Sequence, residues 1–213
     1  MESLWELLLA TIYPRRCSLC DTLGTPPICA VCLGEFPKHP NPHLTFATDS
    51  PLHEAAFGYD YAGRARQAVL RLKMERARAL APPLAHLVAT HLTELGFLND
   101  LDAIVPIPIH WRRWCERGFN QSELLCASLS KEHVRPELLV RTRHTVPQMK
   151  LNAVERQSNL NGAFRAHPDV RGKRILLVDD VYTSGATARE CAHTLVQAGA
   201  QQVRVYALTH GGG

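Results

Sequence analysis

The sequence is poor in several features that would assign a protein to a class at once. Only 7% of its residues are aromatic, and its formal net charge is only +4. A dedicated nucleic-acid-binding domain is usually more strongly basic, so charge alone indicates no partner. The chain also lacks G-x-x-x-x-G-K-[S/T] and G-x-G-x-x-G, which excludes a Walker loop and a Rossmann dinucleotide fingerprint. It contains no internal repeat.

Long apolar runs are missing as well. The N-terminal stretch MESLWELLLATIYPRRC has an acid where a signal peptide is positively charged, and no small-residue cleavage site follows it. Its apolar part is too short to span a bilayer. Leu4, Trp5, Leu8 and Ile12 instead fit one face of a short amphipathic helix that packs on the protein. We therefore expect a cytoplasmic protein without membrane insertion.

What the chain does have is enough apolar material for a core. With 213 residues and 46% hydrophobic content, it can form one domain and a small appendage. We expect an N-terminal helix, a cysteine module and a linker over residues 1–45, followed by an α/β domain over residues 46–213. Residues 37–51, PKHPNPHLTFATDSP, read as the linker because they are rich in proline and polar residues.

Strand and helix patterns alternate from residue 53 onward. We predict strands over residues 55–61, 102–108, 174–180 and 202–210, and helices over residues 64–95, 120–130 and 187–200. The first helical stretch is interrupted at Pro82-Pro83, Asn120 caps the second, and Gly199 ends the third. This alternation predicts an α/β fold with a mostly parallel sheet and helices on both faces.

Four of the seven cysteines form two closely spaced pairs, in the pattern C-x2-C-x8-C-x2-C: Cys17, Cys20, Cys29 and Cys32. Two such knuckles can complete a tetrahedral sulfur site, which predicts structural Zn²⁺; an iron–sulfur cluster is the alternative. Four protein ligands leave no open position for a substrate. The other three, Cys115, Cys126 and Cys191, have no nearby ligand set, and we expect buried, inert thiols.

The stretch ILLVDDVYTSGATA places two acids at the end of an apolar strand. In an open parallel sheet, ligands bind beyond the carboxyl ends of the strands. Small and hydroxyl residues follow, then a helix N-terminus, and both suit a phosphate monoester: Thr183, Ser184, Gly185, Ala186 and Thr187. Asp179 and Asp180 would repel phosphate, so they suit sugar hydroxyls or a bridging metal. The alternative is a helix start with capping acids and no ligand.

A basic stretch follows another predicted strand. VPIPIHWRRWCERGFNQ places Arg112, Arg113 and Arg117 beyond a strand end, where a departing diphosphate would need positive charge. Mg²⁺ would take the remaining diphosphate oxygens. The alternative for this stretch is a solvated surface loop.

Taken together, these motifs resemble a known family. The acidic stretch resembles the phosphoribosyl-pyrophosphate-binding motif of type I phosphoribosyltransferases. The double C-x-x-C, FGYDYAGRARQAVLRLKMERARALA, VPIPIHWRRWCERGFNQSELL and RTRHTVPQMKLNAVERQSNLNGAF resemble the ComF/GntX family, which is associated with competence for DNA uptake.

The resemblance implies a type I phosphoribosyltransferase-like fold with a small N-terminal zinc module. It implies that Asp179 and Asp180 are catalytic, that residues 182–187 hold the 5-phosphate, and that the stretch with the three arginines is the pyrophosphate loop. Tyr182 departs from the usual pattern and would have to point away from the phosphate. Lys73 matches a lysine typical of the family, and we expect Gln148 and Arg156 to touch ligand from a flap over residues 141–165.

Three functions remain open on the sequence. The first is transfer of a phosphoribosyl group from phosphoribosyl pyrophosphate, with Mg²⁺, to an acceptor that the chain does not identify. The second is binding of phosphoribosyl pyrophosphate or a nucleotide without turnover. The third is a competence accessory that contacts single-stranded DNA through the zinc module and the basic helix, or contacts other competence proteins; the low aromatic content argues against it.

Overall fold

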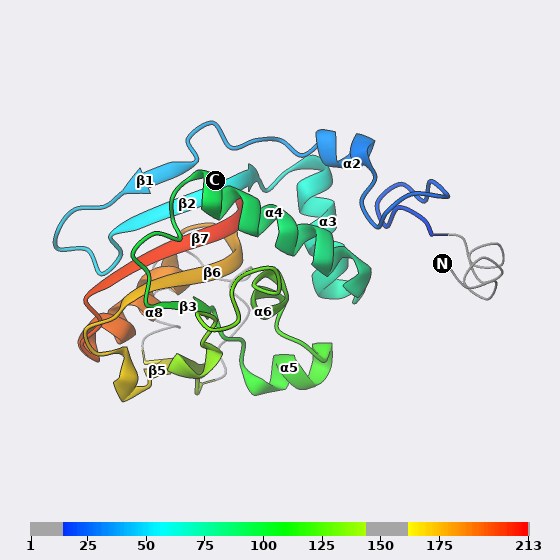
Figure 1. Cartoon of the computed structure of the whole chain (residues 1–213). Coiled ribbons are helices and arrows are strands. Elements are labelled where there is room, and N and C mark those ends of the chain that lie inside the picture. Colours follow the sequence, from blue (N-terminus) through cyan, green and yellow to red (C-terminus); the bar gives the residue numbers. More distant parts are fainter. Residues whose placement is uncertain (1–14, 144–161, 213) are drawn as a thin grey trace.

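The computed structural model describes residues 15–143 and 162–212 (Figure 1). Its strands are β1 (His43–Thr45), β2 (Glu54–Asp60), β3 (Ala103–Pro106), β4 (Leu139–Arg141), β5 (Phe164–Ala166), β6 (Arg174–Tyr182) and β7 (Gln202–His210). Its α-helices are α2 (Ala30–Gly34), α3 (Gly63–Met74), α4 (Ala81–Glu94), α5 (Trp111–Arg117), α6 (Gln121–Leu125) and α8 (Ala186–Gln197). Short 3-10 turns lie at η1 (Arg78–Leu80), η2 (Pro136–Leu138) and η4 (Pro168–Val170).

The main sheet has the strand order β1-β2-β7-β6-β3. Strands β2, β7, β6 and β3 are parallel, and β1 is antiparallel to β2 at the edge. Val178 of β6 is in register with Tyr206 of β7 and with Pro106 of β3. The carboxyl ends of these three strands therefore lie on the same side of the sheet, and we call this side the carboxyl edge. The predicted mostly parallel sheet is confirmed.

The sheet separates two hydrophobic clusters. One lies under α3, α4 and α6, and the other lies under α8 and the β4–β5 pair (Figure 1). Alternate residues of β6 supply both, because Leu176 and Val178 face the first while Ile175 and Leu177 face the second. Near-continuous apolar strands of this kind are expected where both faces are covered. The prediction of helices on both faces is confirmed.

Several predicted boundaries were wrong. The stretch over residues 64–95 breaks at residues 75–77, where Arg76 has a φ of 54°, and not at Pro82-Pro83. The two prolines lie in the first turn of α4, where a missing N–H removes no helical hydrogen bond. The linker includes β1, which pairs with β2.

The elements around the predicted site also differ from expectation. β3 covers only Ala103–Pro106, and α6 ends at Leu125, after which the chain continues in tighter i→i+3 turns. β6 runs two residues past Asp180, and α8 begins at Ala186. Two predicted terminal residues are confirmed: the Asn120 side chain accepts from the Ser122 N–H (3.1 Å) at the start of α6, and Gly199 follows α8 with a φ of 99°.

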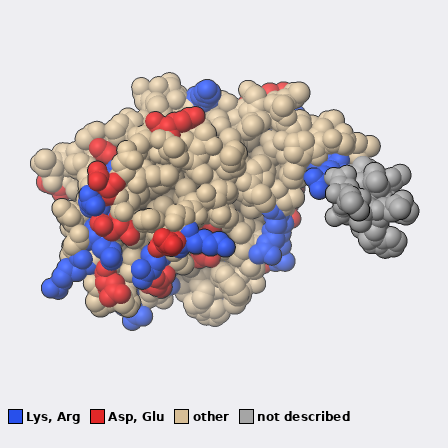
Figure 2. Space-filling model, in the orientation of Figure 1, with Lys and Arg blue, Asp and Glu red and all other residues tan. Residues whose placement is uncertain are grey.

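Charges on the face drawn in Figure 2 are mixed in sign, with Lys and Arg interspersed among Asp and Glu. No patch of a single sign dominates this view, as the small net charge leads one to expect. Among the described residues, no helix is both long enough and apolar enough to cross a bilayer.

Candidate functional site

Asp179 and Asp180 lie within the last four residues of β6, at the edge where β3 and β7 also end. Asp180 is only 2% exposed, whereas Asp179 is partly exposed and lines a small pocket. Two adjacent acids therefore have different environments: one is inside the protein and the other is open to a ligand.

Each acid has a partner from the helices that cover this face. Lys73 Nζ, near the C-terminal end of α3, lies 2.6 Å from Asp180 Oδ2. The two groups form an ion pair, but their angles are not those of a hydrogen bond. Ser122 Oγ of α6 donates to Asp179 Oδ1 (3.0 Å), and the Asp180 N–H donates to the same oxygen (2.9 Å). The helices thus hold both carboxyl groups in place.

Protonation of Asp179 is sensitive to this setting. Burial, and then the charge of Asp180, raise the pKa of Asp179 to about 7, although Lys73 and the Asp180 N–H act in the opposite direction. A carboxyl group with a pKa near neutrality exchanges its proton readily with a bound ligand or water.

The turn between β6 and α8 requires glycine at position 185. Gly185 has a φ of 72° and is the N-cap of α8, and a Cβ there would lie 2.1 Å from Tyr182 Oη. Thr183 and Thr187 line the same pocket as Asp179, at the positive end of a twelve-residue helix. Arg189 Nη2 donates to the Ser184 carbonyl and holds the turn from the helix side. The arrangement suits a small anion.

Tyr182 is largely buried at the base of the turn. It is 8% exposed, its ring lies 5.0 Å from that of Phe57, and it stacks on His210 at 5.8 Å. It forms part of the pocket wall, with its hydroxyl beneath Gly185. Tyr182 therefore shapes the turn from below.

The basic stretch after β3 is a helix, so the expectation of a loop was wrong. Arg113 and Arg117 lie one turn apart on α5 and are partly buried, while Arg112 is exposed and lies over the Trp111 ring at 5.5 Å. Arg117 donates to Gln121 Oε1. Burial lowers the pKa of Arg117, and the charge of Asp180 partly offsets that effect.

Sequence reasoning missed two residues of the site. Arg141, at the end of β4, lies over the Phe164 ring at 5.4 Å; burial and the charge of Arg113 lower its pKa, and Asp179 opposes this. A polar segment follows Arg141 in the sequence, but a basic residue at the end of a short apolar stretch, Leu138-Leu139-Val140, is a usable signal. Ser122, two residues after the predicted N-cap Asn120, has no such signal in the sequence. Gln148 and Arg156 lie outside the described residues.

These side chains bring more positive than negative charge to one edge of the sheet. Lys73 of α3, Arg117 of α5 and Arg141 of β4 act on the two acids from elements far apart in the sequence. Arg113 acts on the other two arginines. Such a site can bind a ligand that combines phosphate groups with hydroxyls.

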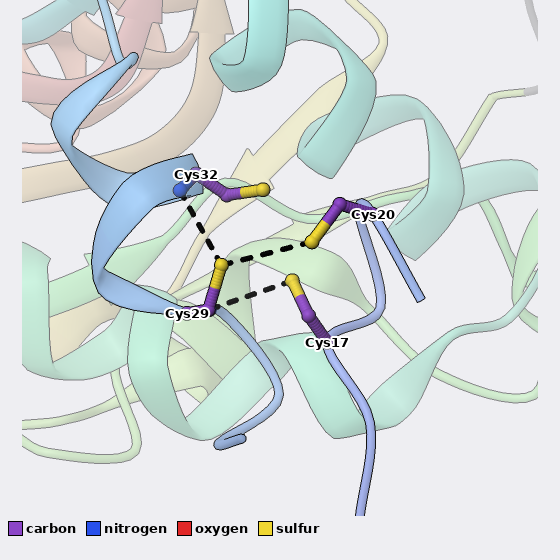
Figure 3. A group of neighbouring side chains, drawn as sticks. All are labelled: Cys17, Cys20, Cys29 and Cys32. Atoms are coloured by element: carbon purple, nitrogen blue, oxygen red, sulfur yellow. Dashed lines mark hydrogen bonds between the residues drawn. The ribbon is translucent and has the colours of Figure 1, made fainter. Parts of the chain in front are cut away.

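The four paired cysteines converge on one point, as predicted. Cys17 and Cys20 lie on one loop and Cys29 and Cys32 at the start of α2, with their sulfurs turned toward one another (Figure 3). All four Sγ atoms lie within 4.8 Å of one another, and Cys20 Sγ lies 3.7 Å from Cys29 Sγ. The sulfurs of a tetrahedral zinc site are separated by about 3.8 Å, given Zn–S bonds of about 2.3 Å. The cluster could hold a metal ion.

The surroundings of the paired cysteines favour the thiolate form at Cys17 and Cys20 but not at Cys32. Burial raises the pKa of Cys17, but N–H donors from Cys29 and Leu19 outweigh it and leave that pKa below its ordinary value. The side chain and N–H of Thr22 lower the pKa of Cys20 to about 6, whereas burial and the other thiols raise that of Cys32. A bound cation would favour ionisation of all four. Of the remaining cysteines, Cys126 and Cys191 are buried as expected, but Cys115 is exposed.

Comparison with known proteins adds to this geometry. The phosphoribosyl transferase domain family matches residues 138–212, which include β6, the turn and α8. DNA utilization protein YhgH of Escherichia coli O6:H1 is 39% identical over 155 residues, which is 70% of this chain and 68% of that protein. The protein of the same name from Salmonella typhimurium is 33% identical over 205 residues, 91% of this chain and 85% of that one. Competence protein F of Haemophilus influenzae is 37% identical over 114 residues, 50% of this chain and 49% of that protein.

The residues that the family model matches include both the acid pair and its turn, and the fold around them is that of a type I phosphoribosyltransferase-like domain with an N-terminal cysteine cluster. The chain therefore belongs to the ComF-like family.

Proposed function

We propose that this protein binds phosphoribosyl pyrophosphate together with Mg²⁺ and transfers the phosphoribosyl group to an acceptor. The observation that carries the proposal is the pocket that Asp179 shares with the turn at residues 183–187, flanked by the cationic side chains of α5 and β4. Such a site offers a phosphate cradle, a carboxylate for the sugar and positive charge for a diphosphate.

In the proposed reaction the bond from the sugar C1 to the diphosphate breaks, and the diphosphate leaves with the electron pair. The acceptor then bonds to C1 and loses its proton to solvent. Asp179 faces the ribose hydroxyls, and the enclosed Asp180 adds negative charge that helps to stabilise positive charge near C1. Arg113, Arg117 and Arg141 stabilise the leaving group. Arg112, which is exposed, would contribute less.

Mg²⁺ would enter with the diphosphate, whose oxygens it prefers, and would neutralise part of its charge. Lys73 already engages Asp180, so Asp179 is the carboxylate that would face the ion. The cysteine cluster would hold Zn²⁺ in a structural role, since four sulfurs complete its coordination. We propose two units close to the expected 1–45 and 46–213, but with the boundary before His43, because β1 pairs with β2 in the main sheet. We also propose a cytoplasmic location.

Calorimetry with phosphoribosyl pyrophosphate and Mg²⁺ tests the site without knowledge of the acceptor. Wild-type protein should bind, and the double variant Asp179→Asn plus Asp180→Asn should not, while its far-ultraviolet spectrum is retained. Asp169→Asn is the matched control, because Asp169 is exposed and precedes the opposite end of β6. Unchanged affinity in the double variant would contradict the proposal. Pyrophosphate release on incubation with bases or nucleotides distinguishes a transferase from a protein that only binds the ligand.

Binding of single-stranded DNA in support of competence is the second candidate function. Trp111 and Trp114 of α5 are 61% and 52% exposed, and Arg112 lies over the first of them, as in a platform on which bases stack. The names DNA utilization protein and Competence protein F among the relatives agree with it.

Fluorescence anisotropy with a labelled oligonucleotide tests this function. The variant Trp111→Ala plus Trp114→Ala should weaken binding about tenfold or more, since each stacked base contributes on the order of 1–3 kcal/mol. An unchanged affinity would remove α5 as the platform.

A further inference from the structure

Helix α3 contacts both the cysteine cluster and the acid pair. Arg64 Nη1 donates to the Leu19 carbonyl (3.0 Å), and Arg71 Nη1 donates to the Ser18 carbonyl. Both carbonyls lie between Cys17 and Cys20, in the first cysteine pair. Arg64 Nε also donates to Glu35 (2.9 Å), the residue that ends α2. In Figure 1, α3 lies next to α2 and beside α4.

The helical repeat places these contacts on different sides of α3. Arg64 and Arg71 are seven residues apart and differ by only about 20° around the helix, whereas Lys73 lies about 200° from Arg71. One side therefore faces the cysteine pair, and Lys73 extends from another side to Asp180, 2.6 Å away. Between them is a buried face that shares one hydrophobic cluster with the cysteine module: Ala65, Ala68, Val69 and Leu72 pack with Cys17, Leu19 and Cys32.

Apart from this buried face, the N-terminal end of α3 has little local support. Its N-cap is Ala62, which makes no side-chain capping bond, and its first turn has no acid. Arg64 and Arg66 instead bring positive charge to the positive end of the helix dipole, which is unfavourable. The Leu19 carbonyl and the Glu35 carboxylate offset the charge of Arg64.

We propose that the metal-bound cysteine module positions Lys73 against Asp180 through α3, with Arg64 and Arg71 as the positioning residues. When a metal fixes the first cysteine pair, the Ser18 and Leu19 carbonyls set the position and rotation of the helix. Loss of the metal or of either arginine frees the helix, and Lys73 leaves a carboxylate that is 2% exposed. The consequence for phosphoribosyl pyrophosphate affinity rests on the proposed function; the position of Lys73 does not.

Acetylation of Lys73 by acetic anhydride, followed by mass spectrometry, measures that position directly. The exposed Lys131 is the internal reference. Relative to wild-type protein loaded with Zn²⁺, the Lys73 rate should rise about fivefold in Arg71→Ala and after chelation, which is the scale of one lost hydrogen bond. Arg66→Ala is the matched control: Arg66 is on the same helix but lies over the Tyr61 ring, 5.7 Å from its centroid.

An unchanged Lys73 rate in Arg71→Ala would overturn the inference. If that variant does not fold, as judged by its thermal melt, Arg64→Ala tests the same link at a more exposed contact and should change the rate in the same direction.

A double-mutant cycle on ligand affinity tests whether Arg71 acts through Lys73. Arg71→Ala should weaken phosphoribosyl pyrophosphate binding in the wild-type background and have no further effect in Lys73→Ala. Additive losses would show that Arg71 acts by another route and would overturn the proposed link. Absence of ligand binding by the wild-type protein would contradict the proposed function alone, because the acetylation rates still decide whether α3 positions Lys73.

Discussion

Lys73 Nζ and Asp180 Oδ2 lie 2.6 Å apart, and the carboxylate of this pair is almost fully enclosed while the ammonium is partly exposed. The pair joins α3 to β6 across 107 residues of sequence. It also places a cation within reach of Asp179, whose pKa it helps to lower against the effect of burial.

Removal of Lys73 should destabilise the protein, because it leaves a buried carboxylate without its cation. Since Lys73 is partly exposed, we expect Lys73→Met to reduce the free energy of unfolding by about 2 kcal/mol, below the range for fully buried pairs. Urea unfolding measures this. Adding Asp180→Asn should recover part of the loss, and an equal loss in the double variant would contradict the pairing.

The raised pKa of Asp179 should make stability depend on pH. The folded protein holds this proton up to about pH 7, whereas an unfolded aspartate releases it near 3.8. The contribution to stability is therefore full below pH 3.8 and is lost as pH rises through about 7. Asp179→Asn should be more stable than wild type at pH 8 in urea unfolding, and this difference should shrink steadily as the pH falls from about 7 toward 3.8. A difference independent of pH would contradict the shifted pKa.

Gly185→Ala should reduce the free energy of unfolding more than Gly172→Ala does. Both glycines have a φ near 72°, so both changes carry the left-handed penalty of about 1–2 kcal/mol. A Cβ at position 172 meets nothing within 4 Å, but at position 185 it would overlap Tyr182 Oη. We expect an added loss of about 1–3 kcal/mol for the overlap. Thermal unfolding compares the two variants, and equal losses would contradict the close packing of Tyr182.

The cysteine cluster should be required for metal content. Cys17→Ser should lose zinc, measured by elemental analysis after dialysis, and should unfold at a lower temperature, because metal binding contributes folding free energy. Cys115→Ser is the control, since Cys115 is exposed and separate from the cluster. Full zinc retention in Cys17→Ser would refute this ligand set.

The arginines of α5 should contribute unequally to the binding of phosphoribosyl pyrophosphate. Arg113 is partly buried and acts electrostatically on Arg141, whereas Arg112 is exposed over Trp111. Arg113→Met should therefore weaken phosphoribosyl pyrophosphate binding about tenfold, the scale of one charge-assisted hydrogen bond, and Arg112→Met should weaken it less. Calorimetry measures both, and the reverse order would contradict the geometry.

Patterns local in sequence were the reliable guides to the fold. Alternating apolar strands and helices predicted the parallel sheet and its two covered faces, and the C-x2-C spacing predicted the sulfur cluster. Boundaries were less accurate near prolines, because Pro82-Pro83 can begin a helix as readily as end one. At α5, the sequence signals of a loop were outweighed by a His110 side chain that caps Arg112 N–H and a left-handed Gly118 that ends the helix.

Part of the candidate site was encoded locally as well. The order of strand, two acids, hydroxyl turn and helix indicates an anion site in any α/β protein, because chain direction and the helix dipole are set by neighbouring residues. What only the tertiary structure decided is how the two acids differ. Asp180 became the enclosed partner of Lys73 and Asp179 the partly open wall of a pocket, because α3, α6 and β4 pack on the strand end from distant parts of the chain. The contacts of Arg141, and those of Arg64 and Arg71 with the cysteine loop, arise in the same way, since burial and charge depend on which elements meet in space.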